Sequence, residues 1–488
     1  MIKNNYRISF AIFFFIVFLY RLFVLENSHV DLFFDEAYYW YWSLHPSFGY
    51  YSKPPMVAWM IYIFTHLCGD SVFCIKLPAL IFHSLTAIIV YFIADELFND
   101  DRLSFYSGIS YLTLPLISLL SMVITTDAFL LFFWAFTLLF FVKALKYNNL
   151  IYWILAGIGG GFGLLSKYTM LVFGLSVFLY LCFSKEKRWL LKNKYFKNKY
   201  FYISIIISIL IYIPNFIWQI NHDFISFHHT KDISDIDKLA LHIDKLIEFL
   251  ISQFAVFGPV FFSILIFLLF KPYIRSERFK LLYIFTYTIL FIISFVAILG
   301  RAFANWAAPA YVAGTILIVA YLLFTKKEKL LKIGIAVNII MAISFYHYHT
   351  FLKILDIEIS SKIDPYKRVL GWHQLAEELK PLIKKYPNSV ILYDDRKTMS
   401  EMVYYLRTLK NPHVMYNPTN RYRNQFDMDT NINEYKTKDF IYITKSKHID
   451  NVRKIFDEVN LLKSIKIKVN KDFYREYYVY YLKKYRNK

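Results

Sequence analysis

Long apolar segments, each near the roughly 20 residues that cross a bilayer, dominate the first 348 residues of this 488-residue chain. Short polar stretches separate them. The segments predicted to span the membrane are 8–25, 77–98, 104–124, 128–145, 150–165, 168–183, 200–218, 248–270, 281–299, 304–324 and 331–348. The pattern predicts a polytopic α-helical membrane protein with about eleven transmembrane helices, or ten to twelve because the fifth and sixth segments are short and nearly fused.

From about residue 350 the pattern becomes that of a water-soluble domain. "SVILYDD" and "HVMY" are typical of strands, and "TMSEMVYYLR" is typical of a helix. The alternation continues in "DFIYITKS", "HIDNVRKIFDEV" and "SIKIKV". A small C-terminal α/β domain over 349–488 is therefore predicted after a transmembrane module over 1–348. Its basic balance would suit anionic head groups, although a solvated surface explains it equally well.

Composition agrees with a membrane protein. The chain is 57% hydrophobic with a mean hydropathy of +0.38, whereas soluble domains are about 45–50% apolar. The net charge of +20 raises nucleic acid as a partner, but no recognition module accompanies it. The basic run "SKEKRWLLKNKYFKNK" at 184–199 is more simply a cytoplasmic anchor, so no nucleic-acid partner is expected.

The distribution of Lys and Arg predicts the orientation. Lys3 and Arg7 precede the first apolar segment and no small-residue cleavage site follows it, which indicates a retained signal anchor. The loops on the side of the N-terminus carry 20 Lys and Arg residues, and the opposite loops before residue 350 carry 8. The positive-inside rule then places the N-terminus in the cytoplasm. The first long loop, 26–76, and the C-terminal domain are expected on the outer face.

Three cysteines exclude a disulfide scaffold. Cys68 and Cys74 lie in one loop and could pair, but two unpaired small residues is the interpretation that the sequence favours. Cys182 lies in an apolar segment.

The first outward loop is rich in aromatic residues. "EAYYWYW" and "PPMVAWMIYIF" have the pattern of short helices lying in the membrane interface, where Tyr and Trp rings favour the head-group zone. An aromatic belt of this kind needs no ligand. It does not explain the adjacent Asp35 and Glu36, because anionic side chains near lipid phosphates are unfavourable unless something offsets their charge.

Other charged residues fall on the same predicted face. Asp127 closes "VITTD" at the start of a span, where helix capping is an equally good explanation. Lys167 lies in "LLSKYTM" and Arg301 precedes "NWAAPAY". Topology alone thus places six charged residues at one boundary: Asp35, Glu36, Lys53, Asp127, Lys167 and Arg301. Such a set suits a phosphate-bearing ligand, with cations for the phosphate and an acid for a proton or a metal.

Two further motifs favour structural roles. "GIGGGFG" at 157–163 does not fit the dinucleotide-binding pattern, and its glycine spacing is that of close helix packing. The histidine group "NHDFISFHH" at 221–229 lacks the spacing of a zinc site on a helix, so a loop role is favoured over metal binding.

A set of motifs in fixed order points to a known family. They are "DEAYYW", "GYYSKPPMVAW", "TTDAFLLFF", "GLLSKYTM", "IWQINHDFISF", "NWAAPAYVAG" and "DPYKRVLGWHQLA", and they cover most of 30–380. The chain resembles the polytopic glycosyltransferases of the GT-C class. It is similar to the branch that holds the protein O-mannosyltransferases and the lipid A aminoarabinose transferases, known as glycosyltransferase family 39.

The resemblance implies transfer of a sugar, with inversion, from a polyprenyl-phosphate donor at the outer face of the plasma membrane. It implies that Asp35 is the catalytic residue, with Glu36 beside it, and that Lys53 holds the donor phosphate. Asp127 corresponds to the second loop acid of the family. Many relatives have Glu before the Lys-Pro-Pro motif, where this chain has Ser52, so a role for that acid is in doubt.

Topology adds Lys167 and Arg301 to this candidate site, and the rings of Tyr50 and Tyr51 lie beside Lys53 in the sequence, where they could stack on a sugar. No cofactor is certain. A divalent cation, required by some relatives only, would have Asp35 and Glu36 as its candidate ligands.

The acceptor predicted is lipid A or another envelope glycolipid of the bacterial inner membrane. Transfer to Ser or Thr of a protein stays open, as does a transporter or flippase of lipid-linked sugars. A transporter more often shows inverted repeats and charges near the bilayer midplane, and neither is found in the sequence. A non-catalytic scaffold leaves the acidic pair unexplained.

Overall fold

The computed structural model describes residues 5–28, 30–183, 198–234, 241–419 and 421–486. Most of the basic run at 184–199 lies outside the described residues. The chain divides into two compact units that are not consecutive lengths of sequence. The first unit comprises 1–27, 47–69 and 73–347, and the second comprises 28–46, 70–72 and 348–488. The predicted outward loop therefore contributes to both units.

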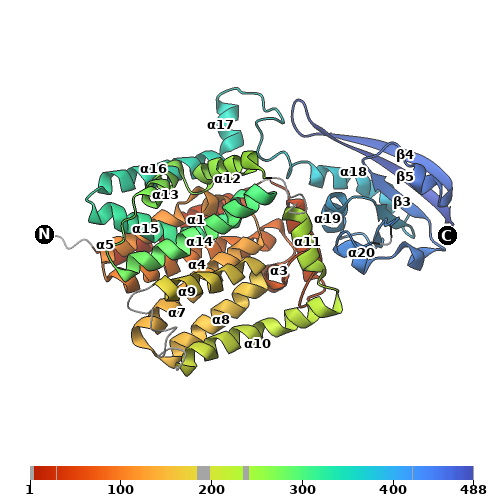
Figure 1. Cartoon of the computed structure of the whole chain (residues 1–488). Helices are drawn as coiled ribbons and strands as arrows, with labels where there is room; N and C mark the ends of the chain where they lie inside the picture. The colour runs from red at the N-terminus through yellow and green to blue at the C-terminus, as the bar shows by residue number, and fades with distance from the viewer. Residues whose placement is uncertain (1–4, 29, 184–197, 235–240, 420, 487–488) are drawn as a thin grey trace. The chain divides into compact units, whose positions relative to one another are not determined.

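The first unit is a bundle of helices (Figure 1). Within the described part of the chain, six helices are long and apolar enough to cross a membrane: α1 (Tyr6–Glu26), α4 (Val72–Phe98), α7 (Thr126–Tyr147), α10 (Lys199–Asn221), α14 (Glu277–Leu299) and α16 (Glu328–Tyr346). Shorter apolar helices are α3 (Met56–Cys68), α8 (Leu150–Ser166), α9 (Leu171–Phe183), α13 (Pro259–Phe270) and α15 (Ala310–Phe324). The remaining ones are α5 (Asp101–Leu112), α6 (Pro115–Leu120), α11 (Ile225–Ser234) and α12 (Ile243–Val256). The polytopic helical architecture predicted from the sequence is confirmed.

Two of the predicted spans are broken in the structure. Residues 104–124 form α5 and α6, because Pro115 forces the preceding Leu114 into an extended conformation. Residues 248–270 form α12 and α13, which are separated at Gly258 with a φ of 92° before Pro259. The histidine group at 221–229, for which a loop was favoured, is partly helical, since His228 and His229 lie on α11.

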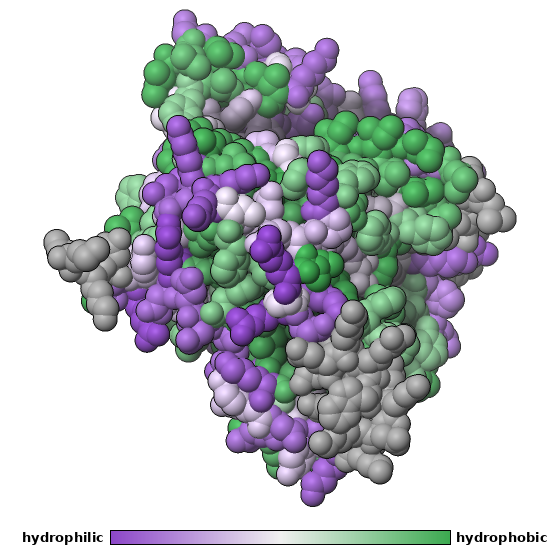
Figure 2. All heavy atoms as spheres, turned by 60° about the vertical axis from the view of Figure 1, so that its left-hand side comes forward, coloured by the Kyte–Doolittle hydropathy of each residue, from purple (hydrophilic) through white to green (hydrophobic). Residues whose placement is uncertain are grey.

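The bundle is apolar inside and outside. The buried core centres on α15, whose residues from Ala310 to Leu322 are all buried. Apolar side chains also cover broad areas of the molecular surface (Figure 2). On α1 alone, the exposed ones are Ile8, Ile12, Phe15, Ile16, Leu19 and Phe23. An apolar exterior of this extent fits a protein that is surrounded by lipid.

Glycines of the "GIGGGFG" run let α8 pack closely between α7 and α10 (Figure 1). A Cβ atom at Gly157 would lie 2.5 Å from the Ser204 carbonyl oxygen on α10, and one at Gly159 would lie 2.5 Å from Thr137 Oγ1 on α7. The predicted packing role of these glycines is confirmed.

A disulfide between Cys68 and Cys74 joins the end of α3 to the start of α4. The expectation of two unpaired cysteines is therefore wrong. The sequence gives only their spacing of six residues, whereas pairing requires that the turn at Gly69, with a φ of 89°, brings the two Cα atoms within 5.9 Å. Cys182 is free and lies on α9, as expected.

The second unit contains the predicted α/β domain. Its five-stranded sheet has the order β2-β1-β3-β5-β4. β1 (Val390–Tyr393) is parallel to β2 (His413–Met415) and β3 (Phe440–Thr444), while β5 (Tyr474–Tyr485) is antiparallel to β3 and β4 (Phe456–Lys468). The helices of the unit are α2 (Phe34–Ser43), α17 (Tyr348–Ile354), α18 (Trp372–Lys384), α19 (Arg396–Tyr405), α20 (Gln425–Asp429) and α21 (Asp450–Arg453).

The helix predicted over "EAYYWYW" is α2, and most of its rings are buried in the protein rather than exposed on a lipid-facing side. Its rings pack inside the second unit, with Tyr38 5.1 Å from Phe426 and Trp40 5.0 Å from Tyr404. Aromatic composition is the same for a membrane belt and a buried interface, so the sequence did not separate the two. The second predicted helix, α3, does expose apolar side chains, including Ile63 and Leu67.

Candidate active site

A buried carboxylate with two donors lies at the start of α7. The Asp127 side chain is only 2% exposed, and its Oδ1 atom accepts a hydrogen bond of 2.6 Å from Lys167 Nζ. The Oδ2 atom accepts a second one, also 2.6 Å, from Asn305 Nδ2. Both oxygens of the carboxylate are therefore engaged by donors from other segments of the first unit.

Local structure explains how these groups meet. Thr125 is the N-cap of α7 and accepts a hydrogen bond from the Asp127 backbone N–H, so Asp127 itself is free for longer-range contacts. Lys167 is the C-cap of α8, the helix that packs antiparallel beside α7. Two of the predicted site residues, Asp127 and Lys167, are thus in direct contact. Helix capping was the alternative explanation for Asp127, but Thr125 is the residue that caps α7.

Asn305 was not predicted. It lies on the 3-10 turn η3 (Ala304–Ala307), four residues after Arg301. Arg301 is exposed and stacks on Phe303, with its guanidinium carbon 4.5 Å from the ring centre. Among the described residues it makes no hydrogen bond with Asp127. The family-like motif "NWAAPAY" begins with Asn305, and that was the signal available in the sequence.

The loop carrying Tyr50, Tyr51 and Lys53 is held from α10 and α11. Asn215 Nδ2 donates to the Phe48 carbonyl oxygen at 2.6 Å, and Ser226 Oγ donates to the Tyr50 carbonyl oxygen at 2.7 Å. Gln219 Nε2 in turn donates to Ser226 Oγ at 2.8 Å. These bonds fix the backbone on both sides of Gly49, so the loop is preorganised.

The side chains of this loop differ in their access to a ligand. Tyr50 is buried, and its hydroxyl accepts a hydrogen bond from the Ser47 backbone N–H. Tyr51 is also buried, with its ring 4.9 Å from that of His229. Lys53 is half-buried. Of the three, only Lys53 carries a positive charge.

The acidic pair lies on the first turn of α2, in the second unit. Glu36 is buried, and its Oε2 atom accepts a hydrogen bond of 2.8 Å from the Phe33 backbone N–H. Glu36 thereby caps its own helix. Asp35 faces outward from this turn with a side chain that is 35% exposed. The two adjacent acids thus have different roles, and Asp35 is the one that is accessible for chemistry.

Asp35 is paired with Arg396, the first residue of α19. The Arg396 Nη1 atom donates to Asp35 Oδ1 at 3.0 Å. Burial lowers the pKa of the Arg396 guanidinium, but Asp35, Tyr38 and Tyr39 each raise it, and together they raise the pKa overall. Arg396 was not predicted. The sequence signal is the charged "DDRK" that follows β1, since ligand-binding residues in α/β sheets lie beyond the carboxyl ends of strands.

The predicted site residues therefore form two groups, one in each unit. Lys53, Asp127, Lys167, Arg301 and the two tyrosines belong to the first unit, and Asp35 and Glu36 belong to the second.

The acidic pair is a poor fit for a metal site in this arrangement. Asp35 is neutralised by Arg396, and Glu36 is engaged by backbone. The described residues include no group of three or more His, Cys, Asp or Glu side chains arranged to hold a metal ion.

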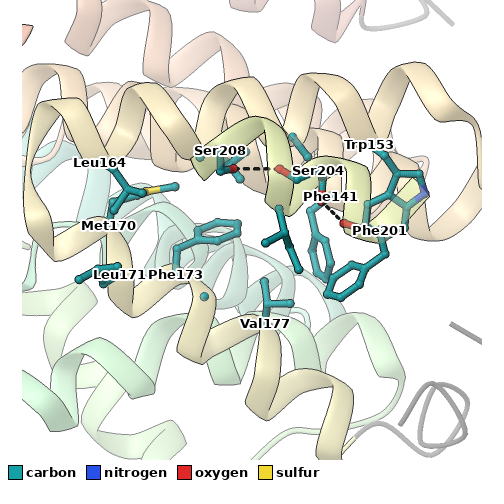
Figure 3. A pocket seen from close by; sticks show the side chains of 15 residues that line it. Phe141, Trp153, Leu164, Met170, Leu171, Phe173, Val177, Phe201, Ser204 and Ser208 are labelled. Atoms are coloured by element: carbon teal, nitrogen blue, oxygen red, sulfur yellow. Dashed lines mark hydrogen bonds between the residues drawn. The ribbon is translucent and has the colours of Figure 1, made fainter. Parts of the chain in front are cut away.

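An apolar cavity of about 260 Å³ lies among α7, α8, α9 and α10 (Figure 3). Its walls are mostly aromatic and aliphatic, including Phe141, Trp153, Met170, Phe173 and Val177. The serines at its edge, Ser204 and Ser208, already donate to backbone carbonyls. The lining contains no acid or base, so this cavity suits a hydrocarbon chain rather than the reacting groups.

Comparison with known proteins identifies the family. Residues 52–218 match the family model described as dolichyl-phosphate-mannose-protein mannosyltransferase. The lipid A galacturonosyltransferase RgtD of Rhizobium johnstonii is 30% identical over 393 residues, which are 80% of this chain and 80% of that protein. The chain belongs to this family of GT-C membrane glycosyltransferases. It is thus an enzyme that depends on a polyprenyl-phosphate sugar, which sets the transporter and scaffold alternatives aside.

Solved structures show that this GT-C glycosyltransferase has the fold of its family. ArnT from Cupriavidus metallidurans, bound to undecaprenyl phosphate, superposes with a TM-score of 0.69 at 13% identity and covers 98% of both chains. An oligosaccharyltransferase of Archaeoglobus fulgidus gives a TM-score of 0.51 at 14% identity, covering 82% of this chain and 62% of that one. The predicted fold class, a helical GT-C membrane module with a small C-terminal α/β domain, is confirmed.

Proposed function

We propose that this glycosyltransferase moves a sugar from a polyprenyl-phosphate donor to lipid A, or to another envelope glycolipid, at the outer face of the bacterial inner membrane. The observation that carries the proposal is the likeness to RgtD over 80% of both chains. The name of that relative makes galacturonic acid the first sugar to test. The undecaprenyl phosphate held by ArnT supports a carrier of the same chemical class.

The charged groups support a direct displacement at the anomeric carbon. The leaving phosphate of the donor carries charge that a preorganised cation stabilises best in a site of low dielectric. Lys53, on its anchored loop, is proposed for this role, and Lys167, which is paired with Asp127, is proposed as a second cation. A hydroxyl acceptor needs a base, which we assign to Asp35. A phosphate acceptor is already anionic and needs only positioning. Displacement in one step inverts the anomeric centre.

Two features support an outward-facing reaction. The bias of Lys and Arg places the loop after α1 outside. The Cys68–Cys74 disulfide lies between α3 and α4, and disulfides persist in oxidising compartments such as the periplasm. These two arguments are independent, since one rests on charge and the other on redox chemistry.

The test is mass spectrometry of lipid A from a strain that lacks this gene and is complemented with variants. We expect the wild-type chain to restore one sugar mass and Asp35→Asn to reduce transfer by about 10²–10⁴-fold, the usual contribution of a general base. Asp450→Asn is the matched control, because Asp450 is also a first-turn acid of the second unit but is exposed and unrelated to the site. Full transfer by Asp35→Asn at normal abundance in the membrane would refute the assignment.

A protein acceptor is the second candidate, because the matching family model is described by protein mannosylation. The same strains separate the two. An unchanged lipid A spectrum, together with the loss of a hexose mass from envelope glycopeptides, would favour transfer to Ser or Thr.

A further inference from the structure

We propose that Arg396 is a positioning residue for the transfer reaction, and that the C-terminal α/β domain contributes it. The inference rests on the proposed function, in which Asp35 is the reacting carboxylate. Arg396 would hold that carboxylate in one orientation. It would act through Asp35 rather than through the substrate.

The geometry of Arg396 ties it to the turn that carries Asp35. Its Nη1 atom donates to Asp35 Oδ1 at 3.0 Å. Its guanidinium carbon lies 5.2 Å from the ring centre of Phe34 and 5.0 Å from that of Tyr38, which are both on α2. Contacts to three side chains of one helix leave the Asp35 carboxylate little rotational freedom.

The backbone of Arg396 is also fixed. The preceding Asp395 caps α19, with its Oδ2 atom accepting hydrogen bonds from the backbone and the hydroxyl of Thr398. Lys445, at the end of β3, donates to the same oxygen at 2.7 Å. The guanidinium is therefore presented from a capped helix that follows a central strand of the sheet.

The ion pair is not what attaches α2 to the α/β domain. Buried contacts do so: Tyr38 accepts a hydrogen bond from the Gln425 backbone N–H, Leu32 donates to the Tyr405 hydroxyl at 2.9 Å, and Trp40 packs on Tyr404. In contrast, the side chains of Asp35 and Arg396 are 35% and 33% exposed. Ion pairs that water reaches contribute little to folding compared with buried aromatic packing. A structural purpose therefore explains this pair poorly.

The pairing leaves one oxygen of Asp35 available. Oδ1 is engaged by Arg396, whereas Oδ2 has no hydrogen-bond partner among the described residues. A base needs an oxygen within reach of the acceptor hydroxyl, in an orientation that is set before the substrate arrives. Arg396 supplies that orientation through the hydrogen bond from its Nη1 atom to Oδ1.

The test compares three variants of the full-length enzyme in detergent, assayed with a polyprenyl-phosphate sugar. Arg396→Gln removes the pair, and Arg396→Lys keeps the charge without the planar fork. Lys397→Gln is the matched control: Lys397 is the next residue, exposed, and lies 5.0 Å above the same Phe34 ring, but it has no carboxylate partner among the described residues.

We expect Arg396→Gln to lower kcat by about 50-fold or more with the KM for the donor unchanged within about threefold, because the residue acts after binding. Arg396→Lys should recover about tenfold of that loss, and Lys397→Gln should stay within about twofold of the wild type. The double variant Asp35→Asn/Arg396→Gln should be no slower than Asp35→Asn alone, since Arg396 acts through Asp35. Thermal unfolding of Arg396→Gln should match the wild type.

Three results would overturn the inference. Normal kcat in Arg396→Gln would make the pair incidental. Weaker binding of undecaprenyl phosphate by Asp35→Asn/Arg396→Gln than by Asp35→Asn would make Arg396 a substrate-binding residue. A collapse of folding in both Arg396 variants would make it structural. The proposed function fails separately, through full activity of Asp35→Asn.

Discussion

Asp127, at the start of α7, is almost completely buried, and Lys167 supplies its countercharge. Removing one partner of a buried pair leaves an uncompensated charge and costs about 3–5 kcal/mol, while replacing both by neutral groups is often harmless. We therefore expect Lys167→Met to lower the apparent Tm clearly, and Asp127→Asn/Lys167→Met to recover most of that loss. Fluorescence-monitored unfolding in detergent measures both.

The double variant also separates stability from function. If Lys167 contributes to donor binding, Asp127→Asn/Lys167→Met should be stable but still impaired in transfer. Lys329→Met is the control, because Lys329 is exposed on α16. Equal stability of the single and double variants would show that the pair is not coupled.

At this scale the sequence predicted the neighbours that follow from adjacent helices. Asp127 and Lys167 meet because the start of α7 and the end of α8 must lie at the same membrane face. Asn305 is 178 positions from Asp127, and Arg396 is 361 positions from Asp35. Periodicity and spacing carry no information on such contacts. Those residues became visible only when the fold brought their segments together.

Among the elements, α8 is the helix whose position depends most directly on glycine, because its glycines have no Cβ atom to keep neighbouring helices apart. A Cβ at Gly157 would lie 2.5 Å from a backbone oxygen of α10, which no side-chain rotation can relieve. We expect Gly157→Ala to destabilise the protein by about 1–3 kcal/mol, as overpacking does. Transfer should also fall, because α10 carries Asn215 and Gln219, which hold the loop of Lys53.

Gly174 provides the matched control for this substitution. It lies on α9, with no atom within 4 Å of the Cβ that it lacks. Gly174→Ala should be neutral or stabilising by about 0.4–1 kcal/mol, because alanine restricts the unfolded chain. A similar Tm change for the two variants would mean that helix propensity, not interhelical distance, governs both sites.

Element boundaries show which sequence signals were usable. The spacing of Gly157, Gly159, Gly161 and Gly163 predicted close packing because a stripe of small residues on a transmembrane helix lets a neighbouring helix approach closely. The breaks at Pro115 and at Gly258-Pro259 were hidden by hydropathy, which averages over a window and ignores helix breakers. The strands β1 and β3 were predictable because their apolar runs are short and bounded by polar residues.

Across the whole molecule, the loop after α1 is divided between the two compact units. Residues 28–46, with Asp35, belong with the α/β domain, and residues 47–69, with Lys53, belong with the helical bundle. The charge bias alone could not reveal this division, because it reports only on which side of the membrane a loop lies. The charge bias does predict the side itself: under the positive-inside rule we expect the α/β domain to face outward and the turn between α15 and α16 to face the cytoplasm.

Cysteine labelling in intact spheroplasts tests that orientation. A single cysteine is introduced at each of two exposed positions, in a variant whose Cys68, Cys74 and Cys182 are replaced by serine. Tyr422→Cys, in the α/β domain, should react with a membrane-impermeant maleimide, since its side chain is 58% exposed. Lys329→Cys, at the start of α16, should react only after permeabilisation. The native chain supplies a further check, because the Cys68–Cys74 disulfide on the same face should require a reductant before either thiol is labelled. Labelling of Lys329→Cys from outside would invert the topology and place Asp35 in the cytoplasm, where an outward-facing transfer to an envelope glycolipid could not take place.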